Sequence, residues 1–98
     1  GKAILAEMDG LKKAIEKWGV DAQVKMLREE CLECALQIGK YTERDGSTEN
    51  FLKTIDEIAD VTIMSRQMKL IPGWESIIQE RIDFKMNRLN ERLKENKF

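Results

Sequence analysis

Two groups of acidic residues stand inside apolar, helix-forming stretches of this 98-residue chain. One group occupies residues 29–33, with the sequence EECLE, and the other occupies residues 56–60, with the sequence DEIAD. Acidic residues three or four positions apart on a helix point the same way and lie about one turn, roughly 5 Å, apart. Like charges at this spacing repel, and apolar neighbours strengthen the repulsion by excluding water. The pattern therefore indicates a divalent cation that neutralises the acids.

The residue types available restrict which cation this is. The chain contains no histidine, which excludes a His-based triad and a His-ligated zinc or di-iron site within one chain. Carboxylate oxygens must then hold the metal, and they favour hard ions such as Mg²⁺, Mn²⁺ or Ca²⁺. If the two acid-bearing helices pack antiparallel, four carboxylates converge: Glu30, Glu33, Glu57 and Asp60. Such a set leaves room for water and a phosphate group, so it suits a phosphate substrate.

Two further patterns bear on function. One flank of the last predicted helix carries a basic stripe: Arg81, Lys85, Arg88 and Arg92. This stripe could hold the remaining phosphates of a substrate, although basic stripes and acidic pairs taken singly are more often solvated helix faces. Cys31 and Cys34 form a C-x-x-C inside a helical pattern with no second pair, so we interpret them as small apolar residues.

Apolar residues at helical spacing predict four helices and no strand. Stop and N-cap signals come from Gly19, Asp21, Ser47 and the proline at position 72. A polar loop is expected over residues 43–47. The predicted helices cover residues 2–18, 21 to about 40 or 42, 47 to about 69, and 74 or 75 to 94.

The second and third predicted helices are unusual in how their side chains are distributed. One stripe of the second helix contains polar and acidic residues but no lysine that could pair with the acids, unlike the surface of a salt-bridged helix. Its members are Gln23, Met26, Glu30, Glu33 and Gln37. The third is apolar around most of its circumference, which is typical of a helix buried on several sides. Three other helices in 98 residues cannot easily provide that burial, so we expect a homodimer or homotetramer.

Composition places the chain among single-domain globular proteins. Hydrophobic residues make up 42% and charged residues 36%, so residues 1–98 are expected to form one all-α domain. No apolar run is long enough to cross a bilayer, and Glu7 and Asp9 interrupt the first apolar stretch where a signal peptide would lie. A net charge of −1 gives no general attraction for a nucleic-acid polymer. We expect a cytoplasmic protein without a membrane partner.

These residues resemble the MazG-like superfamily of all-α nucleoside triphosphate pyrophosphohydrolases, which includes dimeric dUTPases and dCTP-hydrolysing relatives. The resemblance spans roughly residues 15–93. It rests on residues 29–33 and 57–60, which reproduce the pattern E-E-x-x-E…E-x-x-D, on Trp18, Gly19 and Gln23 ahead of them, and on a late lysine followed by arginine. It implies a four-helix bundle completed by homo-oligomerisation. The implied reaction converts a nucleoside or deoxynucleoside triphosphate to the monophosphate and pyrophosphate, through attack of metal-activated water on the α-phosphorus.

The resemblance also assigns roles to individual residues. It implies Mg²⁺, or Mn²⁺, as the cofactor, with Glu30, Glu33, Glu57 and Asp60 as its ligands. It implies that Glu29 orients or deprotonates the attacking water, and that Lys85 with Arg88 or Arg92 holds the substrate phosphates. Gln23 lies on the acidic stripe and could reach the nucleotide, and Trp18 is a further candidate for nucleobase contact. The long insertions of the larger dUTPases are missing, which leaves base specificity open.

Two other functions compete with the enzyme. A non-catalytic sensor would bind Mg²⁺ and nucleotide yet release no pyrophosphate. A helical oligomerisation or adaptor module would use its acids only to solvate its surface, and it would tolerate Glu57→Gln.

Overall fold

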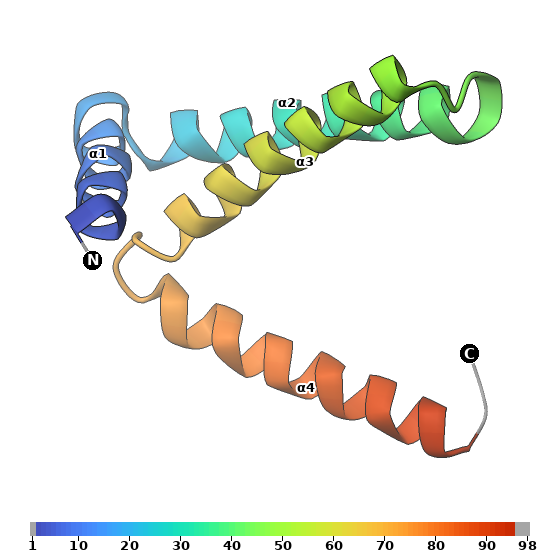
Figure 1. Cartoon of the computed structure of the whole chain (residues 1–98). Coiled ribbons are helices and arrows are strands. Elements are labelled where there is room, and N and C mark those ends of the chain that lie inside the picture. The colour runs from blue at the N-terminus through green and yellow to red at the C-terminus, as the bar shows by residue number, and fades with distance from the viewer. Residues whose placement is uncertain (1, 96–98) are drawn as a thin grey trace.

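The computed structural model describes residues 2–95, which fold into helices joined by short turns without any strand (Figure 1). The elements are α1 (Lys2–Trp18), α2 (Val20–Gly39), the π-helical turn η1 (Lys40–Arg44), α3 (Thr48–Met68) and α4 (Trp74–Lys94). The prediction of an all-α chain with four α-helices is confirmed. Within the described residues, no helix is long and apolar enough to cross a membrane.

The boundary between α1 and α2 differs from the prediction. Asp21 was expected to cap the second helix, and this is wrong, because α2 begins at Val20 and Asp21 lies in its first turn. Gly19 is the N-cap and adopts φ 89° and ψ 159°. This positive φ is open to glycine at little steric cost, so a single residue redirects the chain from α1 into α2.

Helical winding also extends further into the connection between α2 and α3 than expected. The predicted loop was to begin at Glu43, but helical winding continues as a π-turn to Arg44, with Asp45 N donating to Lys40 O at 2.9 Å. Ser47 caps α3 as predicted, since its hydroxyl accepts a hydrogen bond from Asn50 N at 3.2 Å. The start and end of α4 match the prediction.

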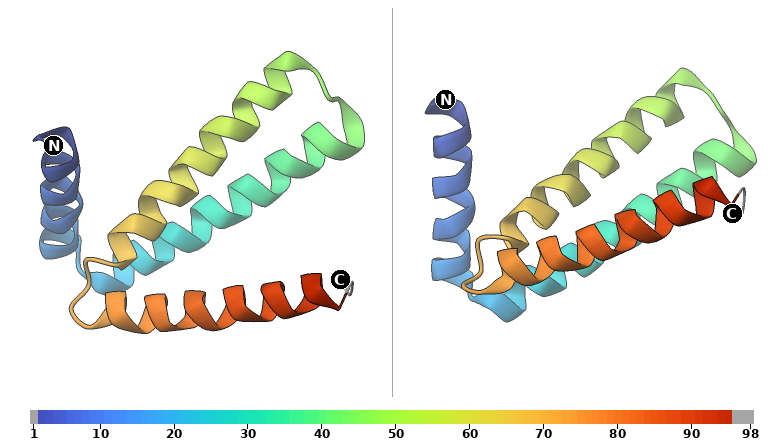
Figure 2. Two further views of the ribbon diagram at one scale, coloured as in Figure 1. Left: turned by 60° about the horizontal axis from the view of Figure 1, so that its bottom comes forward. Right: turned by 90° about the horizontal axis from the view of Figure 1, so that it is seen from below.

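The helices α2 and α3 form an antiparallel hairpin, which positions the two acidic groups (Figures 1 and 2). Helix α1 crosses one end of the hairpin, and α4 starts at that same end and then diverges from it. The only buried apolar cluster of residues 2–95 lies there, built from Met64, Met68 and Ile71. Half-buried apolar residues pack around it: Ile15, Val20, Val24, Leu27 and Ile78. One end of the hairpin is therefore closed by apolar packing.

Three members of the α2 stripe described above face α3, namely Glu30, Glu33 and Gln37. Gln23 and Gln37 are buried, and Gln37 Nε2 donates to Asn50 O at 3.3 Å. Cys34 is buried beside them, whereas Cys31 is exposed. The interior of the hairpin is thus largely polar beyond the apolar cluster.

Candidate metal centre

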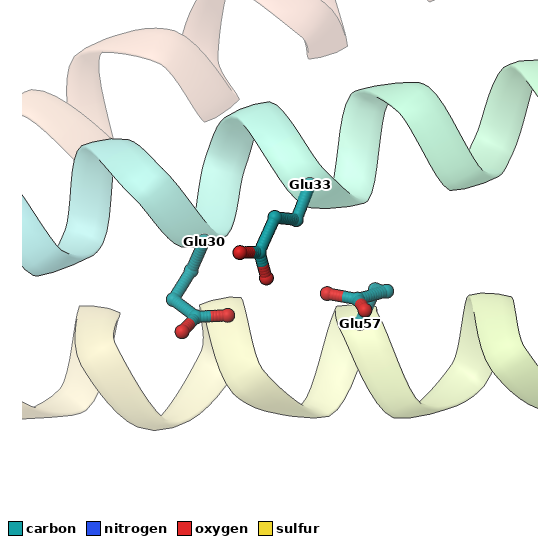
Figure 3. A group of neighbouring side chains, drawn as sticks. All are labelled: Glu30, Glu33 and Glu57. Atoms are coloured by element: carbon teal, nitrogen blue, oxygen red, sulfur yellow. The ribbon is translucent and has the colours of Figure 1, made fainter.

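Three carboxylates meet between α2 and α3. Glu30 and Glu33 project from α2 and Glu57 projects from α3, and all three side chains enter the space between the helices (Figure 3). One oxygen from each lies within 4.8 Å of the others. The i,i+3 spacing puts the first two on one side of α2, and the antiparallel hairpin places Glu57 opposite them. Three of the four predicted metal ligands are therefore brought together.

The carboxylates of this cluster lack compensating partners. Glu30 Oε2 and Glu57 Oε2 are buried and have no hydrogen-bond partner in the structure. The four ion pairs found within residues 2–95 involve other acids. A buried carboxylate oxygen that has lost water without gaining a donor is energetically costly. These two atoms are therefore suitable ligands for a cation.

Burial and the negative charge of the cluster raise the pKa of two of its carboxyl groups. Burial raises the pKa of Glu30 above its ordinary value, and the negative charges of Glu33, Asp60, Glu57 and Glu29 add to the effect in that order. Burial likewise raises the pKa of Glu57, followed by the charges of Glu33, Asp60 and Asp56. Both carboxyl groups thus resist ionisation in the metal-free fold, and a bound cation would reverse that resistance.

Three acids surround the cluster without joining it. Asp60 is exposed and lies outside the group of oxygens within 4.8 Å, although its charge raises the pKa of Glu30 and of Glu57. Glu29 is exposed on α2, and its charge adds to the raised pKa of Glu30. Asp56 was not singled out as a site residue, and its contribution to the pKa of Glu57 could have been inferred from its place beside that residue.

The two residues proposed for the nucleobase lie at some distance along the chain from the acids. Gln23 precedes Glu30 by seven residues on the same face of α2, which corresponds to roughly 10 Å along the helix. Trp18 ends α1 and is 58% exposed. The ammonium of Lys17 lies 5.3 Å from the centroid of the Trp18 ring.

The basic residues of α4 are separated from the acids in a single chain, because α4 diverges from the hairpin (Figure 2). The guanidinium carbons of Arg81 and Arg88 lie 4.6 and 6.0 Å from the ring centroid of the exposed Phe84. Arg88 and Arg92 line a shallow depression beside Phe84. Lys85 is exposed on the same helix. Phe84 was missed by sequence reasoning, although its position three residues after one arginine and four before another signals this contact.

The donor set fits a hard divalent cation. All three converging ligands are carboxylates, which suit Mg²⁺ or Mn²⁺ better than a thiophilic metal. Asp60 and Glu29 add negative charge at the rim. No family model, curated protein or solved structure matches this chain.

Proposed function

We propose that this chain is a Mg²⁺-dependent nucleoside triphosphate pyrophosphohydrolase of the MazG-like type. The observation that carries the proposal is the convergence of Glu30, Glu33 and Glu57, with two buried oxygens lacking any partner, between two antiparallel helices. The substrate would be a nucleoside or deoxynucleoside triphosphate, and the products would be the monophosphate and pyrophosphate. Such substrates are abundant in the cytoplasm, where we place the activity.

The three converging glutamates would hold Mg²⁺ or Mn²⁺, with Asp60 as a further ligand from the exposed side. Bound Mg²⁺ would neutralise charge on the phosphates and lower the pKa of a nearby water molecule. The rim of the cluster remains open, because Glu33 and Asp60 are exposed. A phosphate group can therefore approach the carboxylates from solvent.

Glu29 is the residue to which we assign the proton of the attacking water. It is an exposed carboxylate next to Glu30 in the chain, and its charge reaches that residue. In the reaction, the water oxygen forms a bond to the α-phosphorus, and the proton passes to Glu29. The bond from the α-phosphorus to the oxygen bridging to the β-phosphorus breaks, and pyrophosphate leaves with that oxygen.

The triphosphate needs cationic partners besides the metal. We assign these to Lys85 together with Arg88 or Arg92, and we assign contact with the nucleoside end to Gln23 or Trp18. The acids and the basic stripe lie apart in one chain, which supports an active form that is a homodimer or homotetramer.

The decisive test is pyrophosphate release from a panel of common and modified NTPs and dNTPs, with Mg²⁺ and with EDTA. Glu57→Gln removes one charge of the cluster, and Glu49→Gln is the matched control. Glu49 lies on the same helix and forms an exposed ion pair with Lys53, which is worth little to stability. We expect Mg²⁺-dependent release that Glu57→Gln lowers by roughly a hundredfold or more, the range for loss of one electrostatic contact to a transition state. The control should retain activity.

Other results would identify the competing functions. Mg²⁺-dependent nucleotide binding in a calorimeter, with no pyrophosphate released from any substrate, would identify a sensor. Absence of both binding and release would leave a helical oligomerisation or adaptor module. Equal activity of Glu57→Gln and the wild type would refute the role of the acidic cluster.

A further inference from the structure

A cavity of about 300 Å³ lies between the first half of α1, the end of α3 and the start of α4. Its lining contains no member of the acidic cluster. Half of the lining residues are apolar, namely Ile4, Met8, Leu11 and Leu70. The other half are charged, namely Glu7, Arg66, Lys69 and Glu75. Small-molecule sites combine an apolar lining with a few charged or polar groups, and they begin at about this volume.

Two polar contacts hold α1 beside this cavity. Arg66 Nη1 donates to Glu7 Oε1 at 3.0 Å, and Gln67 Nε2 donates to Leu11 O at 3.0 Å. Gln67 is 1% exposed, so the second contact is shielded from competing water. No residue of α1 is buried, and Met8 is 44% exposed. The apolar side chains of α1 are therefore held next to α3 and α4 without closing the space between the helices.

The charges that line the cavity are only partly compensated. Glu7 and Arg66 form an ion pair with each other. Lys69 and Glu75 take part in none of the four ion pairs found within residues 2–95. One cation and one anion thus remain available beside an apolar lining. A ligand that complements all three features carries a carboxylate, an ammonium group and an apolar side chain.

We propose that the cavity binds a free α-amino acid with an apolar side chain, such as leucine or methionine. The ligand carboxylate pairs with Lys69, and the ligand ammonium group pairs with Glu75. The ligand side chain packs against the apolar residues Met8, Leu11 and Leu70.

Size and charge favour this ligand over larger ones. An engineered cavity of about 150 Å³ accommodates benzene, so a volume of about 300 Å³ accommodates a branched aliphatic side chain with its amino and carboxylate groups. A residue inside a peptide lacks both charged groups, and a helix of about 10 Å diameter exceeds the cavity. Because the lining residues are not those of the metal centre, the inference is independent of the proposed function.

Calorimetric titration in EDTA, without nucleotide, tests the binding with L-leucine and two matched analogues. One analogue, 3-methylbutylamine, lacks the carboxylate, and the other, 4-methylpentanoate, lacks the ammonium group. We expect leucine to bind with a dissociation constant on the order of 0.1–1 mM. Each analogue should bind at least about fivefold more weakly, because it loses one ion pair at an exposed site.

Two substitutions assign the charged groups of the ligand to residues of the chain. Lys69→Gln should weaken leucine about fivefold and leave 3-methylbutylamine unaffected, because that analogue has no carboxylate. Glu75→Gln should weaken leucine to a similar degree and leave 4-methylpentanoate unaffected. Both side chains are exposed, so the fold should persist in each variant. Glu80→Gln, which removes an exposed charge farther along α4, is the control and should bind leucine as the wild type does.

The position of the ligand can be read from the methyl NMR signal of Met8, which should shift as leucine is added. Absence of binding by leucine and by methionine at about 10 mM, roughly ten times the weakest expected dissociation constant, would overturn the inference. Equal affinities for leucine and both analogues would overturn it too, because the cavity would then not recognise a zwitterion. A Met8 signal that shifts with protein concentration and not with leucine would assign the cavity to a second copy instead. Leucine binding in a protein that releases no pyrophosphate would reject the enzyme and leave this site standing.

Discussion

The two sides of α3 differ in an unusual way, because its inner side carries an acidic residue and its outer side is apolar. Its inner side carries Glu57 toward α2, with a carboxylate oxygen that has no partner, while its outer side presents Phe51, Ile55 and Ile58 to solvent. An ordinary surface helix buries its apolar stripe and solvates its charges. This reversal motivates our proposals that the inner side binds a cation and that the outer side is covered by another copy of the chain.

The inner side itself is divided along its length. Toward the end of α3, Met64 and Met68 pack into the apolar cluster. Near its start, Gln37 Nε2 of α2 donates to Asn50 O of α3 at 3.3 Å. The acids lie between these two closed regions. The hairpin is therefore held together on both sides of the carboxylates, so their repulsion can be tolerated without a metal.

The largest expected effect comes from truncating an inner and an outer residue of α3. Met68→Ala opens a cavity at a side chain that is 4% exposed, and it should lower the free energy of unfolding by about 2–5 kcal/mol. Ile58→Ala should cost under about 0.5 kcal/mol in an isolated chain. If a second copy covers Ile58, its cost should rise with protein concentration, because assembly and folding are linked.

Urea unfolding followed by circular dichroism at several protein concentrations measures both effects. Leu36→Ala on α2, where the side chain is 70% exposed, is the control for truncating a solvated side chain. A cost for Ile58→Ala that stays constant across concentrations would contradict coverage by a second copy.

The sequence predicted most helix boundaries because they depend on local chemistry. Ser47 caps α3 through one hydrogen bond, and residues 71–73 end one helix and start the next as expected. The errors arose where local signals are absent. Gly19 began α2 without a capping side chain, and the π-turn after Gly39 depends on a change of hydrogen-bond register that no residue type marks. The direction of α4 is set by packing, which a single sequence does not specify.

The candidate site was predictable to the extent that it follows from spacing. Glu30 and Glu33 on one helix and Glu57 on an antiparallel neighbour had to meet once α2 and α3 paired. Asp60 lies about one turn beyond Glu57, so it contributes charge without joining the three oxygens. The family resemblance implied contact of the α4 basic residues with the site, and a single chain does not provide this contact. The sequence could not predict this, because helix spacing says nothing about the angle between helices.

A smaller effect is expected from pH and Mg²⁺ on the inner side. Because the pKa of Glu30 and of Glu57 is raised in the fold above the ordinary 4.5, the folded state holds these protons more tightly than the unfolded state. Their contribution to stability is therefore greatest below pH 4.5 and declines as pH rises from there through the folded pKa values. Glu57→Gln should flatten this decline, whereas Glu49→Gln should not.

Thermal unfolding between pH 4.5 and 8, in EDTA and in Mg²⁺, measures this dependence. Mg²⁺ at ten times its dissociation constant should add about 1.4 kcal/mol at pH 7.5, and less near pH 5, where protons compete for the carboxylates. Stabilisation by Mg²⁺ that is the same in Glu57→Gln as in the wild type would show that the ion binds elsewhere.

The smallest expected effect concerns the N-cap of α3. It stabilises the helix as a whole and is part of neither the acidic inner side nor the apolar outer side. Ser47→Ala removes the hydrogen bond from Asn50 N and should lower the free energy of unfolding by about 1 kcal/mol. Ser47→Asp, which keeps a capping oxygen, should restore it. Because the change leaves Glu57 and Ile58 in place, the stabilisation by Mg²⁺ and the assembled mass should match the wild type in native conditions. If Ser47→Ala instead abolished the stabilisation by Mg²⁺ or the assembly, general destabilisation of α3 could account for the effects of substitutions on its inner and outer sides. The distinction between the two sides would then have to be abandoned.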